Sequence, residues 1–160
     1  MSFSFQVLTQ EQAEEIAYRW QYEEPYAFYN MDADEEDLHD FLDPQKRGST
    51  IYAVMQGRDL YAFFSIERVG QEMYEIGLGM KPEHTGRGGG KAFIRAIVDY
   101  VVSSCSPAKL TLSVATFNQR AIHVYRQNGF VDRNVFMQKT NGDVYEFLRM
   151  ERWFTDKAEI

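Results

Sequence analysis

The sequence predicts an α/β (α+β) fold, a mixed and mostly antiparallel sheet of about seven strands flanked by about four helices. β-rich runs alternate with amphipathic segments along the chain, which is typical of a sheet covered by helices. Hydrophobic residues make up 44% of the chain and aromatic residues 15%, enough for a sizeable core. The length of 160 residues fits one domain, so we expect a single domain over residues 1–160.

The first half of the chain predicts one helix, a loop and several strands. Residues 3–8 alternate like a strand, and Thr9 stands as an N-cap before a helix over 11–20. Residues 21–43 indicate a loop and a short helix. The runs 50–56 and 60–69 flank Gly57-Arg58-Asp59, which predicts a hairpin. Residues 73–80 predict a further strand, and Gly77 and Gly79 inside it indicate a bulge or a close approach by another group.

The second half predicts two helices among three strands. Apolar residues at helical spacing predict a helix from the glycine cluster at 86–90 to about Ser103. Residues 109–115 predict a strand and 118–127 a helix that ends at Gly129. The strands expected over 130–139 and 144–151 flank Asn141-Gly142, a strong hairpin signal.

Composition excludes several classes of protein. Seventeen Lys and Arg against 24 Asp and Glu give a net charge of −7, which argues against a general nucleic-acid binder. The single Cys105 and three scattered His argue against disulfides and against a structural metal site. The start of the chain lacks the pattern of a signal peptide, and no run of about 18 apolar residues occurs. We therefore expect a cytoplasmic protein without a membrane partner and without a metal.

The segment over residues 21–43 is acidic and aromatic and contains no Lys or Arg. Two interpretations stay open. The carboxylates near its predicted helix can stabilise that helix's N-terminus, or they can form a surface that attracts a cationic substrate.

The glycine cluster is the most informative motif. Four of the five residues from Gly86 to Gly90 are glycines, and they lie between a predicted strand and a predicted helix. Their amides, together with the positive end of the helix, suit a phosphate or diphosphate, and Arg87 and Lys91 add positive charge. A P-loop is excluded because Lys91 is followed by Ala92, and a dinucleotide fingerprint is excluded because Lys91 stands where it requires glycine.

Two blocks resemble the GNAT superfamily of N-acetyltransferases. Residues 85–90, Thr-Gly-Arg-Gly-Gly-Gly, resemble its acetyl-CoA diphosphate loop, although Thr85 stands where the family usually has a cationic or amide residue. Residues 118–130 match the family's Asn-x-x-Ala-x-x-x-Tyr-x-x-x-Gly-Phe pattern at every named position. The expected elements from Phe3 to Arg152 also follow the family's order, so the resemblance spans nearly the whole chain.

The resemblance implies transfer of an acetyl group from acetyl-CoA to a primary amine by direct attack in a ternary complex, with acetyl-CoA as co-substrate. It implies Glu75 as the base that removes the amine proton and Tyr125 as the group that assists the leaving thiolate. The residues expected to bind acetyl-CoA are Leu78, Gly79, Met80, Thr85, Gly86, Arg87, Gly88, Gly89, Gly90, Lys91, Asn118 and Tyr125.

Simpler interpretations compete with these roles. Glu75 can be an exposed strand carboxylate, Tyr125 can be a core residue, and Asn118 can simply cap its helix. The position that some members use for a base, five residues before Asn118, is Ser113, which cannot do that work. A base is useful because an alkylamine with a pKa of about 10.4 is almost fully protonated at neutral pH.

The amine acceptor is the least constrained partner. Tyr22, Tyr26 and Tyr29 lie where the family's first two helices meet and usually line the acceptor pocket, and aromatic faces suit a cationic amine. We expect a small amine or a peptide amine. The alternative function is a non-catalytic CoA-binding or sensing module, and a nucleotide binder is a third. The last hairpin offers a sheet edge through which a homodimer could form.

Overall fold

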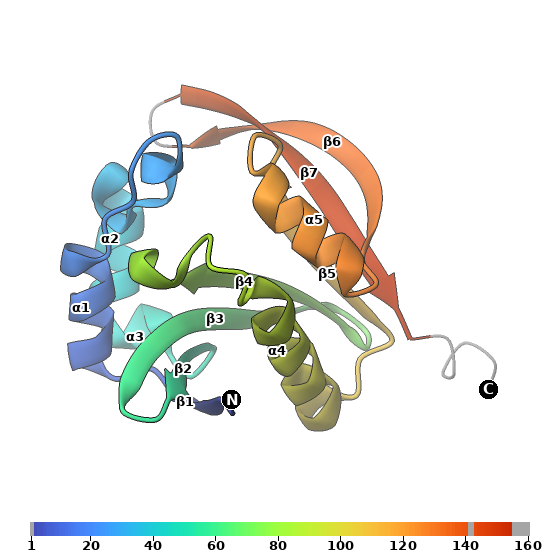
Figure 1. Ribbon diagram of the computed structural model, residues 1–160, viewed down its shortest axis with the longest axis horizontal. Coiled ribbons are helices and arrows are strands. Elements are labelled where there is room, and N and C mark those ends of the chain that lie inside the picture. Colours follow the sequence, from blue (N-terminus) through green and yellow to red (C-terminus); the bar gives the residue numbers. More distant parts are fainter. Residues whose placement is uncertain (1, 141–142, 155–160) are drawn as a thin grey trace. The chain divides into compact units, whose positions relative to one another are not determined.

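A computed structural model describes residues 2–140 and 143–154, and Figure 1 shows its ribbon. Within these residues the strands form one seven-stranded sheet in the order β1-β2-β3-β4-β5-β7-β6. The sheet is mixed, because β4 pairs with β5 in parallel while β5 pairs with β7 antiparallel. The predicted fold class is thereby confirmed. No helix in the described ranges is long and apolar enough to cross a membrane.

The chain divides into two compact units. The first unit comprises Met1–Phe64, Leu78–Thr85 and Lys139–Val144, and the second comprises Ser65–Gly77, Gly86–Gln138 and Tyr145–Ile160. The chain passes from one unit to the other inside strands β3 (Asp59–Gly70), β4 (Met73–Met80), β6 (Val131–Thr140) and β7 (Asp143–Trp153), and between Thr85 and Gly86.

The first unit begins with a strand and a capped helix, as expected. Strand β1 (Ser4–Val7) pairs antiparallel with β2 (Ile51–Gln56), and β3 (Asp59–Gly70) follows after a turn in which Gly57 has a φ of 62°. Helix α1 (Gln10–Arg19) starts with a capping box, in which the Thr9 hydroxyl accepts from the Gln12 amide and the Gln12 side chain accepts from the Thr9 amide.

Short helices follow α1: η1 (Tyr26–Tyr29), η2 (Met31–Ala33), α2 (Glu35–Leu42) and α3 (Pro44–Arg47). Asp34 caps α2 by accepting from the Asp37 amide at 3.1 Å, and Asp43 caps α3 by accepting from the Gln45 amide at 2.9 Å. These carboxylates therefore have a role at helix N-termini. Helix α3 was not predicted, since four residues are too few to show an apolar period.

An aromatic and aliphatic cluster forms the core of this unit. Its buried members are Leu8, Ala13, Ile16, Ala17, Trp20, Phe41, Ala53 and Leu60. One charged side chain lies among them, because Arg47 is only 6% exposed. Its guanidinium donates to the Phe41 carbonyl at 2.6 Å and to Gln10 Oε1 at 2.8 Å, so it joins α3 to α2 and α1.

The second unit contains the long helix α4 (Gly90–Cys105), strand β5 (Lys109–Ala115), helix α5 (Gln119–Gln127) and most of strands β6 (Val131–Thr140) and β7 (Asp143–Trp153). Helices α4 and α5 lie next to each other in Figure 1. The parallel register between β4 and β5 joins Met73–Glu75 to Lys109–Thr111 and ends there, although β4 continues to Met80.

Apolar side chains from α4, β5 and β7 fill the core of the second unit, among them Phe93, Ile97, Leu110 and Met150. Glu151 is also buried, and Lys109 and Arg133 lie 3.2 Å and 3.3 Å from its carboxylate oxygens. Strand β6, last in the sheet order, is largely exposed. The Asn141-Gly142 turn expected between β6 and β7 lies outside the described residues.

Candidate functional site

The glycine cluster forms a turn that leads directly into α4. Gly86 and Gly88 have φ values of 71° and 81°, which side-chain-bearing residues rarely adopt, so glycine is needed at both. Gly89 is the N-cap of α4 and offers no side chain to cap it. The first amides of this 16-residue helix therefore have neither a helical acceptor nor a side-chain cap at Gly89, and a helix end of this kind favours an anion.

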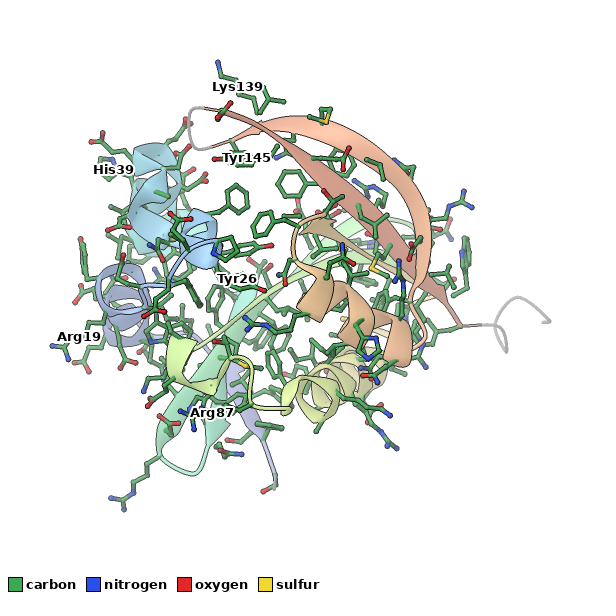
Figure 2. The ribbon with its side chains drawn as sticks, turned by 45° about the horizontal axis from the view of Figure 1, so that its top comes forward. Arg19, Tyr26, His39, Arg87, Lys139 and Tyr145 are labelled. Carbon is green, nitrogen blue, oxygen red and sulfur yellow. The ribbon has the colours of Figure 1, made fainter. Side chains whose placement is uncertain are left out.

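Three cationic side chains belong to this turn or approach it. Arg87 and Lys91 are exposed, and Figure 2 shows Arg87 on the turn before α4. The third is Arg120 of α5, because a Cβ built on Gly86 would lie 3.0 Å from its Nη1. Arg120 was not predicted as a site residue. Arg120 lies in the first turn of α5, where a cation opposes the helix dipole. This unfavourable placement was the sequence signal that could have indicated a role for Arg120 other than stabilising α5.

Helix α5 is capped at its N-terminus and contacts α4 near its C-terminal end. Asn118 caps α5 by accepting from the Ala121 amide at 3.2 Å, which is the simpler role considered for it. Asn128 donates to the Val124 carbonyl at 3.0 Å and to the Lys91 carbonyl at 3.4 Å. A Cβ on Gly90 would lie 3.3 Å from Val124 Cγ2, so Gly90 also permits the close packing of the two helices.

Tyr125 has a buried ring. The residue is 7% exposed and contacts Phe130 edge to face, with ring centroids 6.1 Å apart. Its carbonyl accepts from the amides of Asn128 and Phe130 at 3.0 Å and 3.1 Å, which closes the end of α5. The ring therefore belongs to the core, and the predicted role of the hydroxyl in catalysis stays a prediction.

Glu75 faces a cation that the sequence did not connect with it. Arg149 Nη1 lies 3.4 Å from Glu75 Oε1, and each side chain is 37% exposed. Thr111, the register partner of Glu75 on β5, is buried, and among the described residues its hydroxyl has no hydrogen-bond partner. Glu75 is thus an ion-paired carboxylate that stays accessible to solvent.

The two glycines of β4 make room for side chains of β3. A Cβ on Gly79 would lie 2.5 Å from Phe63 Cε1, and one on Gly77 would lie 2.9 Å from Ser65 Oγ. The close approach expected at these positions is therefore accounted for by neighbouring side chains.

Two of the residues predicted to bind ligands use their hydroxyl groups within the protein. The Tyr22 hydroxyl donates to the Met80 carbonyl at 2.6 Å, and the Thr85 hydroxyl donates to the Pro82 carbonyl at 2.7 Å in η3 (Pro82–His84). Tyr26, labelled in Figure 2, and Tyr29 lie on η1, and Tyr29 is 37% exposed.

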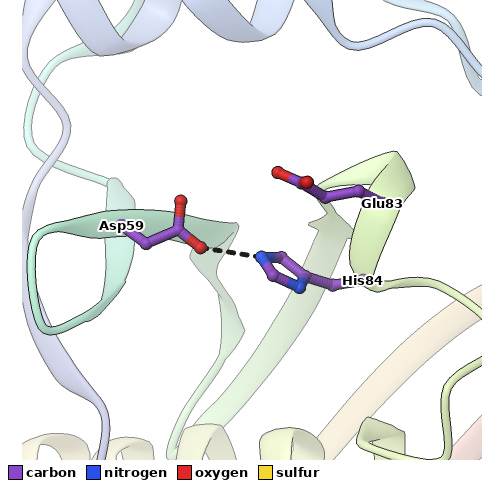
Figure 3. Close-up of side chains that lie close together, drawn as sticks. All are labelled: Asp59, Glu83 and His84. Carbon is purple, nitrogen blue, oxygen red and sulfur yellow. Dashed lines mark hydrogen bonds and ion pairs between the residues drawn. The ribbon is translucent and has the colours of Figure 1, made fainter.

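Asp59, Glu83 and His84 form a cluster that could in principle offer ligand atoms to a metal ion (Figure 3). His84 Nε2 lies 2.7 Å from Asp59 Oδ2, and the Lys81 ammonium lies 3.3 Å from Asp59 Oδ1 and 2.7 Å from Glu83 Oε1. Burial raises the pKa of Asp59, but hydrogen bonds from His84 and Lys81 outweigh it, so this pKa lies below its ordinary value. The carboxylates already have a cationic partner, and the cluster is best described as an ion-pair network.

Comparison with known proteins agrees with this geometry. Residues 13–130, about three quarters of the chain, match the model of the Acetyltransferase (GNAT) family. The chain therefore belongs to this family, and the resemblance expected from the two sequence blocks is confirmed.

Individual similar proteins include enzymes named as spermidine N-acetyltransferases. A spermidine N(1)-acetyltransferase of Vibrio cholerae is 31% identical over 78 residues, which cover 48% of this chain and 45% of that protein. The match thus spans less than half of the relative's length. Among solved structures, a spermidine N-acetyltransferase SpeG chimera from Vibrio cholerae and hSSAT has a TM-score of 0.75 at 18% identity, with both chains fully covered. A dodecameric spermidine N-acetyltransferase from Vibrio cholerae has a TM-score of 0.70 at 20% identity, covering 97% of this chain and 95% of that chain.

Proposed function

We propose that this protein is an N-acetyltransferase that transfers the acetyl group of acetyl-CoA to a primary amine. The observation that carries the proposal is the glycine turn at the start of α4, in which Gly86 and Gly88 adopt left-handed conformations beside the uncapped helix N-terminus. Side-chain-free backbone at this position suits the diphosphate of CoA, and family membership makes an acyl-CoA the expected donor.

The cationic groups near this turn complement its amides. Arg87, Lys91 and Arg120 would balance the charge of the diphosphate, which the net charge of −7 over the whole chain would otherwise repel. In the same proposal the backbone of Leu78, Gly79 and Met80 pairs with the pantetheine amides and polarises the acetyl carbonyl.

The chemical step needs a neutral amine and a good leaving group. Glu75 accepts the amine proton, directly or through water, and the amine nitrogen then attacks the acetyl carbonyl carbon. The nitrogen of the tetrahedral intermediate then loses a second proton to solvent. As the intermediate collapses, the carbon–sulfur bond breaks and Tyr125 supplies a hydrogen bond or a proton to the thiolate; a transferred proton is restored to Tyr125 from solvent. A thiol pKa of about 8.5 makes this departure easier than that of an amine.

The acceptor is proposed to be a cationic amine. The acidic and aromatic segment around Tyr26 and Tyr29 supports this class, as do the curated and structural relatives named for spermidine. We also propose that residues 1–160 act as one catalytic domain and that the protein is cytoplasmic. We further propose a homodimer, which sedimentation analysis would test.

Thermal melting with and without ligand tests donor binding. At about 100 times its dissociation constant, acetyl-CoA should stabilise the protein by about 2.7 kcal/mol, whereas ATP and NAD should not. A panel of amines, with thiol release as the readout, then identifies the acceptor. Stabilisation by ATP or NAD in place of acetyl-CoA would refute the proposed donor.

A non-catalytic CoA-binding module is the second candidate, favoured by two observations. The carboxylate of Glu75 is paired with Arg149, and the ring of Tyr125 is buried in the core. Such a module would be stabilised by CoA and acetyl-CoA alike but would release no thiol with any amine in the panel.

A further inference from the structure

The hydroxyl of Tyr22 has a partner that acceptor binding does not explain. It donates to the Met80 carbonyl at 2.6 Å, where β4 ends. Tyr22 follows α1 by only three residues, whereas Met80 is 58 residues further along the chain. The bond therefore ties the segment after α1 to the end of β4 within the first unit.

The backbone of Tyr22 is fixed as well. Its amide donates to Asn30 Oδ1 at 2.6 Å, and the Asn30 amide donates to the Ala27 carbonyl at 3.0 Å. Burial raises the pKa of the Tyr22 hydroxyl above its ordinary value, so this group remains a donor at physiological pH. Tyr22 is thus held at both ends, and its ring spans the distance between Asn30 and Met80.

The Met80 carbonyl belongs to the Met80–Lys81 peptide, and the N–H group of the same peptide also makes a hydrogen bond. Lys81 supplies the nitrogen of that unit, and its amide donates to the Tyr61 carbonyl on β3 at 2.9 Å. Two hydrogen bonds on opposite sides of one planar peptide fix its orientation. Along an extended strand, consecutive residues direct their backbone groups to opposite sides. The Met80 amide is therefore directed away from β3, as its carbonyl is.

We propose that Tyr22 is a positioning residue for acetyl transfer: by holding the Met80–Lys81 peptide it aims the Met80 amide at the acetyl carbonyl. The inference rests on the proposed function, in which Leu78, Gly79 and Met80 bind the donor. Tyr22 touches the reacting atoms only through Met80, and it reaches Met80 from the segment that also carries Tyr26 and Tyr29.

Tyr22→Phe removes the hydroxyl and keeps the ring. A donor that is preorganised for the transition state affects turnover more than ground-state binding, and direct loss of such a donor costs about a hundredfold or more. Because Tyr22 acts through another group, we expect kcat to fall about tenfold, while the dissociation constant of CoA, which has no acetyl carbonyl, changes less than twofold. Tyr18→Phe is the matched control, since Tyr18 lies on α1 and is 60% exposed.

The measurements are isothermal titration with CoA and steady-state kinetics with acetyl-CoA and an amine that the wild-type protein acetylates. Amide hydrogen exchange at Lys81 adds an independent readout and should accelerate in Tyr22→Phe but not in Tyr18→Phe. Asn30→Ala keeps the Tyr22 hydroxyl but releases the Tyr22 backbone, so it should also lower kcat, but by less than Tyr22→Phe does.

Unchanged kcat in both Tyr22→Phe and Asn30→Ala would overturn the proposal, as would a loss of CoA affinity in proportion to the loss of kcat. Failure of the proposed function is distinguishable, because the wild-type protein itself would then bind neither CoA nor acetyl-CoA or would acetylate no amine.

Discussion

Arg120 offers the sharpest test of the diphosphate site. A Cβ on Gly86 would lie 3.0 Å from its Nη1, so its guanidinium is close to the turn proposed to hold the diphosphate. At about 4 Å, two unit charges at a protein surface interact with up to about 4 kcal/mol, and salt screens much of this. A hydrogen bond to a charged group contributes about 1.5 to 3 kcal/mol, and the exposure of Arg120 favours the lower end.

A loss of about 1.5 kcal/mol corresponds to about a tenfold weaker dissociation constant. We therefore expect Arg120→Gln to weaken CoA binding about tenfold in isothermal titration at low salt, and by less at high salt. Arg95→Gln, an equal change of charge at an exposed position on α4, is the control.

A second ligand distinguishes the loss of a charge contact with CoA from a general folding defect of the variant. Pantetheine lacks the diphosphate, so its affinity should be equal in the wild-type protein and in Arg120→Gln. If the variant loses affinity equally for both ligands, or if CoA binds within twofold of wild type, Arg120 does not contact the diphosphate.

Three further predictions concern the other features of the site. Glu75→Gln should lower kcat by about a hundredfold or more without weakening CoA binding, and a change confined to KM for the amine would show that Glu75 is not the base. Because the pKa of Asp59 lies below its ordinary value in the folded state, its carboxylate stabilises the protein above about pH 4, and this stabilisation is lost as the pH falls through the folded-state pKa. Denaturant midpoints between about pH 6 and about pH 3 should consequently depend less on pH in Asp59→Asn, and an unaltered pH dependence would contradict the assignment. Gly79→Ala places a Cβ 2.5 Å from Phe63 Cε1 and should cost about 1 to 3 kcal/mol in the free energy of unfolding; if adding Phe63→Leu restores nothing, the clash is not the cause.

The sequence was sufficient for the elements with a strong local pattern. The strands over Met73–Met80 and Lys109–Ala115 have the predicted bounds, and Thr9 caps α1 as expected. Periodicity and capping depend only on residues close together in the chain, so a single sequence is enough to reveal them. Helix α3 escaped prediction because it is a single turn that starts at Pro44.

Contacts between distant parts of the chain could not be read from the sequence. The pairing of Glu75 with Arg149 joins residues 74 positions apart, and no local pattern indicates it. The same holds for Arg120 beside Gly86. Gly79 was correctly expected to admit a close neighbour, but the neighbour is the ring of Phe63, and only the register of the sheet decides that.

The buried guanidinium of Arg47 has a consequence for how the first unit opens. Arg47 lies on the short helix α3 and binds α2 and α1 through two uncharged oxygens, the Phe41 carbonyl and Gln10 Oε1. If any of these three helices separates, a full positive charge is left without its acceptors in a water-poor interior. The three helices should therefore detach together and not one after another, and a lysine, with a single nitrogen, could not reproduce the forked geometry that links them.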